Sequence, residues 1–115
     1  MNGGCLCGAV RYRLASEPFD AGWCHCRTCQ LNSGSPAMAF ASVAMENYVV
    51  ERGGDVVKTI KSSGFGHRGF CAACGTPLFM REDHQPATLD LSLATLDRPD
   101  AAKPGFHIFC SSAIA

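Results

Sequence analysis

Apolar and polar residues alternate in several short stretches of the chain, which is the pattern of strands with one buried face. Residues 10–14 alternate between apolar side chains and arginine, and residues 89–93 alternate between leucine and a polar residue. Other candidate strands are 37–43, 47–52, 56–61, 66–70, 76–81 and 106–110. A helix is indicated only at 27–32. The pattern therefore predicts an all-β fold of short antiparallel strands.

The turn residues add one specific expectation to this pattern. Gly53-Gly54-Asp55 separates the candidate strands 47–52 and 56–61. Glycine and aspartate between two β-rich runs are typical of a hairpin connection. We therefore expect these two strands to pair with each other.

Length and composition limit the classes of protein that fit. The chain has 115 residues, the size of one small domain, and 47% of them are hydrophobic, so a core can form. The formal charge is +0, and lysine and arginine are scattered without a basic run. We therefore expect no nucleic-acid partner and no attraction to an acidic membrane.

Targeting signals and membrane-spanning segments can be sought in the sequence. The segment that begins at Met1 has no charged region followed by an apolar one, as a secretory signal would. The longest apolar stretches are far too short to span a bilayer. We expect a cytoplasmic protein without a membrane partner.

The eight cysteines are unusual for so short a chain and need a reason. Disulfides are poorly maintained in a reducing compartment, where clustered cysteines usually bind metal. Cysteines one residue apart are also badly placed to bridge each other and well placed to share an ion. We therefore interpret the clusters as zinc sites, with a disulfide framework as the alternative.

Seven of the cysteines fall into three groups. They are Cys5-Leu6-Cys7, Cys24-His25-Cys26-Arg27-Thr28-Cys29 and Cys71-Ala72-Ala73-Cys74-Gly75. A C-x-x-C turn presents two thiolates to one tetrahedral ion, and the glycine after it lets the backbone turn. Such a zinc knuckle needs two more ligands. Cys5 and Cys7 are suitable, and together the four sulfurs would form a closed structural site.

The middle group predicts a different kind of site. Cys24, Cys26 and Cys29 supply three thiolates from one local segment. Three protein ligands leave one position of a tetrahedral zinc free, which is typical of a catalytic ion. That position can hold water or a substrate thiol, which zinc keeps deprotonated.

A fourth protein ligand would remove the open position and make both zincs structural. The residues that could close the second site are Cys110, His25, His67 and His107. Cys110 is the strongest of these, although a lone cysteine beside an aromatic residue is more often a small buried apolar residue. His25 stands between two ligands and is expected to point away. Arg27, Arg68 and Lys61 are expected to be solvated, with one of them available to a substrate carboxylate.

The cysteine groups, in this order, resemble the glutathione-dependent formaldehyde-activating enzymes, which are grouped with the centromere protein V domain. The resemblance covers nearly the whole chain. It rests on Gly4–Tyr12, Cys24–Cys29 followed by Gly34, Arg68–Leu78, Thr95-Leu96-Asp97 and His107-Ile108-Phe109. Family members usually continue with Ser-Lys-Ala-Pro-Trp and a further tail, whereas this chain reads Cys110–Ala115. We expect a single zinc-binding domain over 1–115 that lacks this tail.

The resemblance implies a fold, a chemistry and a set of ligands. The implied fold is all-β, with small antiparallel sheets in a β-tent around a structural zinc. The implied activity is that of a carbon–sulfur lyase that adds glutathione to formaldehyde, giving S-hydroxymethylglutathione. Two zincs per chain are implied: a structural one on Cys5, Cys7, Cys71 and Cys74, and a catalytic one on Cys24, Cys26 and Cys29.

Two other functions fit the same residues. One is the same zinc chemistry with another thiol or another small electrophile. The other is a zinc-stabilised binding module with two structural zincs and no catalysis. If the chain is an enzyme, a thiolate would attack the aldehyde carbon, and water or His25 would protonate the new alkoxide.

Overall fold

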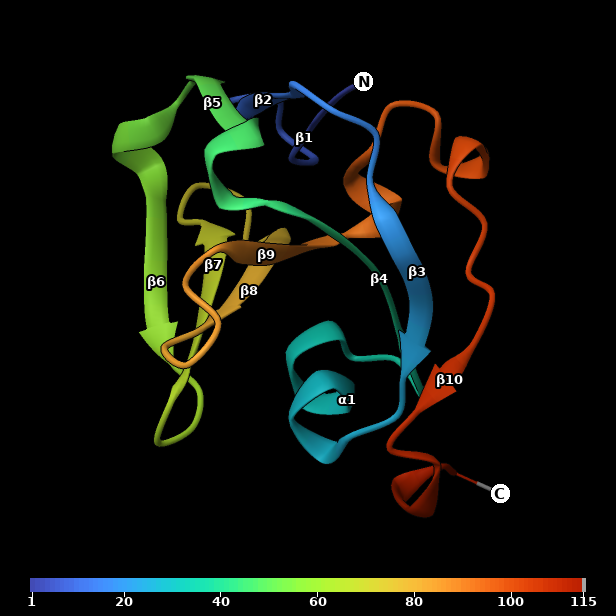
Figure 1. Cartoon of the computed structure of the whole chain (residues 1–115). Coiled ribbons are helices and arrows are strands. Elements are labelled where there is room, and N and C mark those ends of the chain that lie inside the picture. The colour runs from blue at the N-terminus through green and yellow to red at the C-terminus, as the bar shows by residue number, and fades with distance from the viewer. Residues whose placement is uncertain (115) are drawn as a thin grey trace.

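The computed structural model describes residues 1–114, which form two β-sheets and a short α-helix (Figure 1). The smaller sheet has three antiparallel strands in the order β1-β2-β5. Their bounds are β1 (Asn2–Gly4), β2 (Arg11–Leu14) and β5 (Tyr48–Arg52). Cys5 and Cys7 lie in the loop that joins β1 to β2 in this sheet.

The larger sheet has seven strands in the order β10-β3-β4-β9-β8-β7-β6. Its strands are β3 (Phe19–Cys24), β4 (Met38–Ala44), β6 (Val57–Lys61), β7 (Gly66–Cys71), β8 (Pro77–Glu82), β9 (Thr88–Ser92) and β10 (His107–Ile108). Neighbours are antiparallel except β10, which lies parallel to β3. The sheet curves, so that β7 and β3 face each other across the helix (Figure 1).

The helix α1 (Arg27–Ser33) is held by contacts at both of its ends. Cys26 is the N-cap, and its Sγ accepts a hydrogen bond from the Cys29 amide. Gly34 ends the helix with φ 69°, a conformation that glycine adopts without a steric penalty. Connections elsewhere include the 3-10 turns η1 (Met45–Asn47), η2 (Gly54–Val56), η3 (Leu93–Thr95), η4 (Pro99–Ala101) and η5 (Cys110–Ser112).

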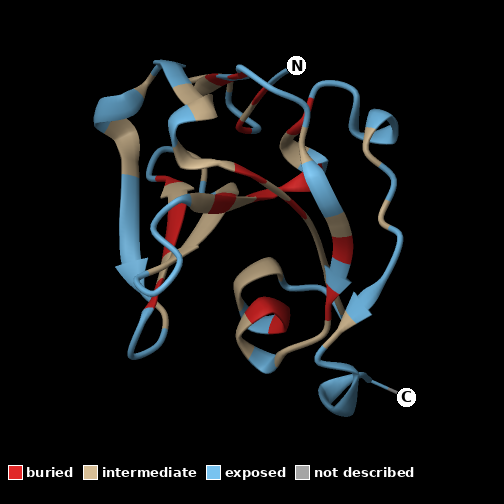
Figure 2. Ribbon diagram, in the orientation of Figure 1, coloured by how far each residue is buried: buried red, intermediate tan, exposed pale blue. Residues whose placement is uncertain are grey.

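The main core lies where the smaller sheet packs against the middle of the larger one. Its buried residues are Tyr12, Leu14, Ala41, Val43, Leu89, Leu91, Leu93 and Leu96. Figure 2 shows buried segments on β4, β7 and β9, whereas β6 and the C-terminal segment are exposed. Tyr12 stacks on Tyr48 with ring centroids 4.5 Å apart, and its hydroxyl lies 2.7 Å from Thr95 Oγ1. These contacts join β2 to β5 and to the turn η3.

The predicted β fold is confirmed, and the expected elements are largely present. The alternation at 10–14 places Val10, Tyr12 and Leu14 inside, as expected. The predicted helix at 27–32 is present as α1. The strands β1 and β3 were not predicted, because β1 has only three residues, two of them glycine, and β3 lacks a regular alternation of apolar and polar residues.

The predicted hairpin between β5 and β6 is wrong. β5 pairs with β2 in the smaller sheet, and β6 pairs with β7 in the larger one. Gly53, with φ 79°, and the turn η2 carry the chain from one sheet to the other. A Cβ at Gly53 would lie 2.1 Å from the Ala9 carbonyl oxygen, so this glycine permits close backbone packing rather than a hairpin.

Candidate active site and metal centres

The first cysteine group comes together from two distant parts of the chain. Cys5 and Cys7 follow β1, while Cys71 ends β7 and Cys74 lies in the turn before β8. The four Sγ atoms lie within 4.8 Å of one another. Cys5 Sγ is 3.5 Å from Cys7 Sγ, which is 3.9 Å from Cys71 Sγ. A tetrahedral zinc with bonds of about 2.3 Å has S···S edges of about 3.8 Å, so the four sulfurs fit this ion.

Local backbone contacts prepare this first group to bind a cation. Gly75 adopts φ 83° and donates its amide to the Cys71 carbonyl at 2.7 Å, which closes the C-x-x-C turn. The Val10 amide donates to Cys5 Sγ at 3.3 Å. Hydrogen bonding by Thr76, whose Oγ1 is 3.2 Å from Cys74 Sγ, lowers the pKa of Cys74 to about 5. The thiolate form that a metal requires is therefore favoured at Cys74.

The second group is formed within one short segment. Cys24 ends β3, Cys26 caps α1 and Cys29 lies in its first turn. The three Sγ atoms lie within 4.8 Å of one another, and Cys24 and Cys29 are buried. A set of three thiolates at this separation also fits zinc, with one position not supplied by the group.

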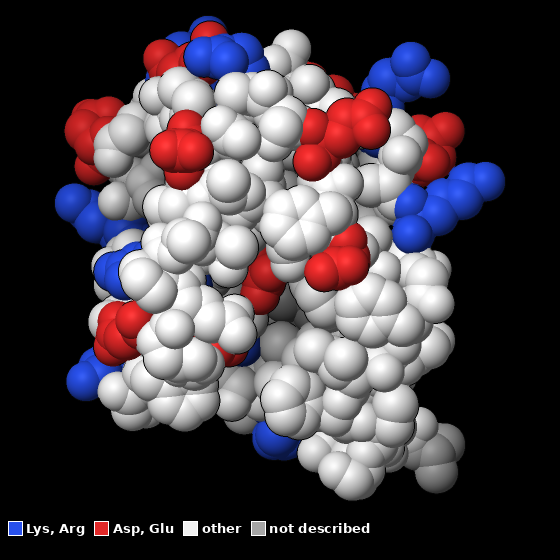
Figure 3. Space-filling model, in the orientation of Figure 1, with Lys and Arg blue, Asp and Glu red and all other residues white. Residues whose placement is uncertain are grey.

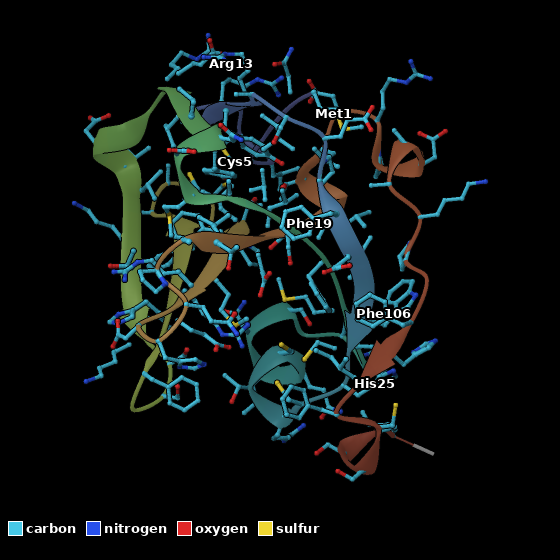
Figure 4. The ribbon with its side chains drawn as sticks, viewed as in Figure 1. Met1, Cys5, Arg13, Phe19, His25 and Phe106 are labelled. Atoms are coloured by element: carbon cyan, nitrogen blue, oxygen red, sulfur yellow. The ribbon has the colours of Figure 1, made fainter. Side chains whose placement is uncertain are left out.

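The residues that could have closed the second site lie elsewhere in residues 1–114. Cys110 is exposed in η5 and belongs to neither cysteine group. His25 lies at the end of β3, where its Nε2 is 2.8 Å from His107 Nδ1 (Figure 4). His67 Nε2 is 2.9 Å from Asp83 Oδ1. Each of these histidines therefore has a partner other than the three sulfurs.

Arg68 on β7 is the functional side chain that the sequence interpretation misjudged. It was expected to be solvated, but it is only 4% exposed. Its Nη2 donates to Cys29 Sγ at 3.3 Å, and its buried Nε has no partner in residues 1–114. Hydrogen bonding by the Cys24 thiol, together with the Arg68 guanidinium, lowers the pKa of Cys29 to about 5. Arg68 thus places a fixed positive charge beside the second group.

The second group borders a cavity of about 330 Å³ between α1 and the larger sheet. Its lining includes all three cysteines, three charged residues of the sheet, and the apolar side chains of Met38, Phe40 and Phe109. The charged residues are Arg68, Glu82 and Asp90. The space-filling view shows a hollow in this region with Asp or Glu atoms at its edge (Figure 3). The second cysteine group therefore lies at the wall of a space that a small molecule could occupy.

The family of the chain follows from its whole sequence. The sequence profile of the glutathione-dependent formaldehyde-activating enzymes matches residues 1–112. The chain belongs to this family. The resemblance carried by the three cysteine groups is thereby confirmed.

Two curated proteins align with the chain. One is an uncharacterized lyase of Schizosaccharomyces pombe, 39% identical over 77 residues, which cover 67% of this chain and 54% of that protein. The other, from Halomonas elongata, is provisionally named a glutathione-dependent formaldehyde-activating enzyme and is 24% identical over 103 residues. That match covers 84% of this chain and 66% of the Halomonas protein. The chain thus spans about half to two thirds of the length of these relatives.

A solved structure shares the fold of this family member. The crystal structure of a Rhodobacter sphaeroides protein superposes with a TM-score of 0.73 at 22% identity, covering 92% of this chain and 99% of that one. The comparison supports the fold alone. Within residues 1–114, no helix has the length and apolarity needed to cross a membrane.

Proposed function

We propose that the chain is a zinc-dependent carbon–sulfur lyase-type enzyme that adds the thiol of glutathione to formaldehyde or to a related small electrophile. The observation that carries the proposal is the second cysteine group, whose three sulfurs border a cavity without a fourth cysteine or histidine beside them in residues 1–114. In the reverse direction, the same site would release formaldehyde and the free thiol.

The two cysteine groups have different roles in this proposal. Cys5, Cys7, Cys71 and Cys74 hold a structural zinc that ties the N-terminal segment to β7 and β8. Cys24, Cys26 and Cys29 hold the catalytic zinc beside the cavity. Zinc bound by three thiolates supplies a Lewis acid that keeps a substrate thiol ionised and nucleophilic at neutral pH.

Other side chains prepare the site around these ligands. Arg68 fixes Cys29 by a hydrogen bond and offsets part of the thiolate charge. Gln30 donates to the carbonyls of His25 and Ser112, both at 3.0 Å, and so ties the C-terminal segment to the ligand loop. The apolar wall of Met38, Phe40 and Phe109 limits access of water. Holding two small reactants in one cavity turns their encounter into a step within one complex.

A kinetic comparison of three proteins tests the proposal. Exchange NMR at equilibrium measures how fast glutathione and formaldehyde interconvert with S-hydroxymethylglutathione, and the uncatalysed rate is subtracted. We expect zinc-loaded wild type and Cys110→Ser to accelerate the exchange equally, because Cys110 is exposed and outside both cysteine groups. Cys26→Ser, with its fold retained by circular dichroism, should show only the uncatalysed rate.

The same comparison separates the proposal from its rivals. If wild type accelerates exchange only with another thiol or aldehyde, the glutathione and formaldehyde assignment is wrong and the chemistry remains. If no thiol and aldehyde pair reacts faster with wild type than without it, the chain is a non-catalytic zinc-stabilised module. The cavity beside the second group favours an enzyme over that module.

A further inference from the structure

Asp90 occupies a position on the larger sheet that faces the same cavity as the three cysteines. In the strand register it lies opposite Ser42 on β4 and Met80 on β8, and Met80 in turn lies opposite Arg68 on β7. Residues directly opposite on neighbouring strands project to the same face of a sheet. Ser42, Asp90, Met80 and Arg68 therefore form one row across the sheet. Asp90, Met80 and Arg68 line the cavity, together with Cys29.

The surroundings of the Asp90 carboxylate leave one of its oxygens available. Ser42 Oγ donates to Asp90 Oδ1 at 2.7 Å, and no other side chain in residues 1–114 hydrogen-bonds to this carboxylate. In the same residues it forms no ion pair with a cation. Burial raises the pKa of Asp90. It is thus a partly buried carboxylate that is oriented by one donor and neutralised by none.

The charged and titratable groups that face Asp90 across the cavity come from four elements. They are Glu82 on β8, Arg68 on β7, Cys24 on β3 and Cys29 on α1. Arg68 is directed to Cys29 rather than to Asp90. Burial is the main cause of the raised pKa of Asp90, and the negative charge of Glu82 adds to it.

The other candidates for proton transfer are less well placed. His25, which the sequence suggested for this role, is not among the residues that line the cavity, and it is hydrogen-bonded to His107. Glu82 lines the cavity, but its Oε2 is engaged by His84 Nε2 at 2.8 Å. Of the two carboxylates that line the cavity, Asp90 is the one with no histidine, lysine or arginine bonded to it in residues 1–114.

We propose that Asp90 carries the proton between the two steps of the thiol addition, an inference that rests on the proposed function. The Asp90 carboxylate takes the proton of the incoming S–H. The resulting thiolate sulfur forms a bond to the aldehyde carbon, and the electron pair of the C=O π bond moves onto oxygen. That alkoxide then takes the proton back from Asp90. The thiol and aldehyde become the hemithioacetal, Asp90 ends as a carboxylate, and no further reactant is needed.

The physical basis of the proposal is the match between the groups that exchange the proton. General acid–base catalysis is most efficient when the pKa of the catalyst approaches those of the reacting groups and the working pH. Burial beside like charges moves Asp90 in this direction. The hydrogen bond from Ser42 fixes one oxygen, so that the other can face the cavity. A carboxylate on the exposed surface would have neither the raised pKa nor the fixed orientation.

The test compares Asp90→Asn with Asp55→Asn as the matched control, because Asp55 is an exposed aspartate in η2 that does not line the cavity. Asparagine keeps the shape and can still accept from Ser42, but it cannot carry the proton. We expect kcat for hemithioacetal formation to fall about a hundredfold in Asp90→Asn, at the low end of the contribution of acid–base groups. The KM, the zinc content and the calorimetric affinity for glutathione should stay at wild-type values. Asp55→Asn should keep the wild-type kcat.

A pH profile separates a proton carrier from a structural residue. The kcat of wild type should fall on the acid side, because a protonated Asp90 cannot take the thiol proton, and Asp90→Asn should lack this acid limb. Ser42→Ala is a second variant for the case that Asp90→Asn does not fold. It removes a bond that stabilises the carboxylate, so its acid limb should move to higher pH.

Two results would overturn the inference, and they are distinct. If wild type is active and Asp90→Asn is equally fast, or loses activity together with zinc or glutathione affinity, then Asp90 is not the proton carrier and the proposed function stands. If wild type itself gives no acceleration with glutathione and formaldehyde, the proposed function fails and this inference fails with it.

Discussion

The guanidinium of Arg68 donates to Cys29 Sγ at 3.3 Å, although the two residues are 39 positions apart in the sequence. This bond joins the middle of β7 to the first turn of α1, and thus connects the larger sheet to the segment that bears the three-cysteine group. The arginine is only 4% exposed and forms no ion pair with a carboxylate in residues 1–114. The positive charge of Arg68 therefore faces the thiolates of the second cysteine group rather than a carboxylate.

Replacing Arg68 should weaken metal binding at the second group. We expect Arg68→Leu to lower zinc affinity there about 10–100-fold, the usual effect of losing a partner of a metal ligand. The zinc affinity of Arg68→Lys should lie between those of wild type and Arg68→Leu, because lysine keeps the positive charge but lacks the several N–H donors of the guanidinium. Competition with a chromophoric chelator measures the affinity. Arg81→Leu is the control, since Arg81 is on the neighbouring strand and 38% exposed. Equal affinities in all four proteins would contradict this role of Arg68.

The first cysteine group should control folding rather than turnover. Cys71 is fully buried among Val10 and Leu78, and its sulfur belongs to the group that joins the two sheets. Cys71→Ser should destabilise the protein by more than about 4 kcal/mol, as loss of a structural metal does. Urea unfolding of wild type, Cys71→Ser and Cys110→Ser checks this. A Cys71→Ser variant as stable as Cys110→Ser would show that the first group is not a structural zinc site.

The stacked pair of Tyr12 and Tyr48 should respond in opposite ways to removal of a hydroxyl. Tyr12 Oη is 2.7 Å from Thr95 Oγ1, which itself donates to the Ser92 carbonyl, so Tyr12→Phe should cost about 0.5–1.5 kcal/mol. The Tyr48 hydroxyl is buried without a partner in residues 1–114. Tyr48→Phe should therefore leave the free energy of unfolding unchanged or raise it. Thermal unfolding of both variants tests the contrast, and a larger loss in Tyr48→Phe would refute it.

The same two tyrosines predict how stability changes at alkaline pH. Burial raises the pKa of Tyr12 to about 12 and also raises that of Tyr48. Between the unfolded value of about 10 and the folded value, the folded chain keeps phenol protons that the unfolded chain loses. The unfolded state then binds fewer protons, so stability falls as pH rises through this range. Unfolding midpoints measured across it should fall less steeply in Tyr48→Phe, and identical slopes would be inconsistent with this account.

The fold could be predicted where neighbouring residues alone determine the structure. Val10, Tyr12 and Leu14 alternate with polar residues and are buried as expected, and Cys24, Cys26 and Cys29 come together within one short segment. Strand pairing was harder, because it depends on contacts between residues far apart. The segment around Gly53 has the sequence of a hairpin, but the Ala9 backbone approaches it and the strands separate.

The sequence did not reveal Arg68 and Asp90 as site residues, because their roles depend on which strands lie next to each other in the larger sheet. Arg68 precedes a glycine in a strand and resembles any surface arginine until β7 is placed against α1. Asp90 lies between two leucines and follows the expected alternation. Its place in the cavity follows from the order β4-β9-β8-β7, which local patterns do not determine. Once the strand order is known, such site residues can be sought among the polar residues of central strands that lie on the same face of the sheet as the cysteines.

The coordination of zinc before and after addition of thiol tests the central claim most directly. X-ray absorption at the zinc edge counts the sulfur ligands of the zinc-loaded protein with and without glutathione. The account predicts that the average sulfur number rises on addition, and that Cys26→Ser, which keeps the first group intact, shows no such rise. An unchanged sulfur number in wild type, already at four per zinc without glutathione, would show that the second group has no open position and is a structural site.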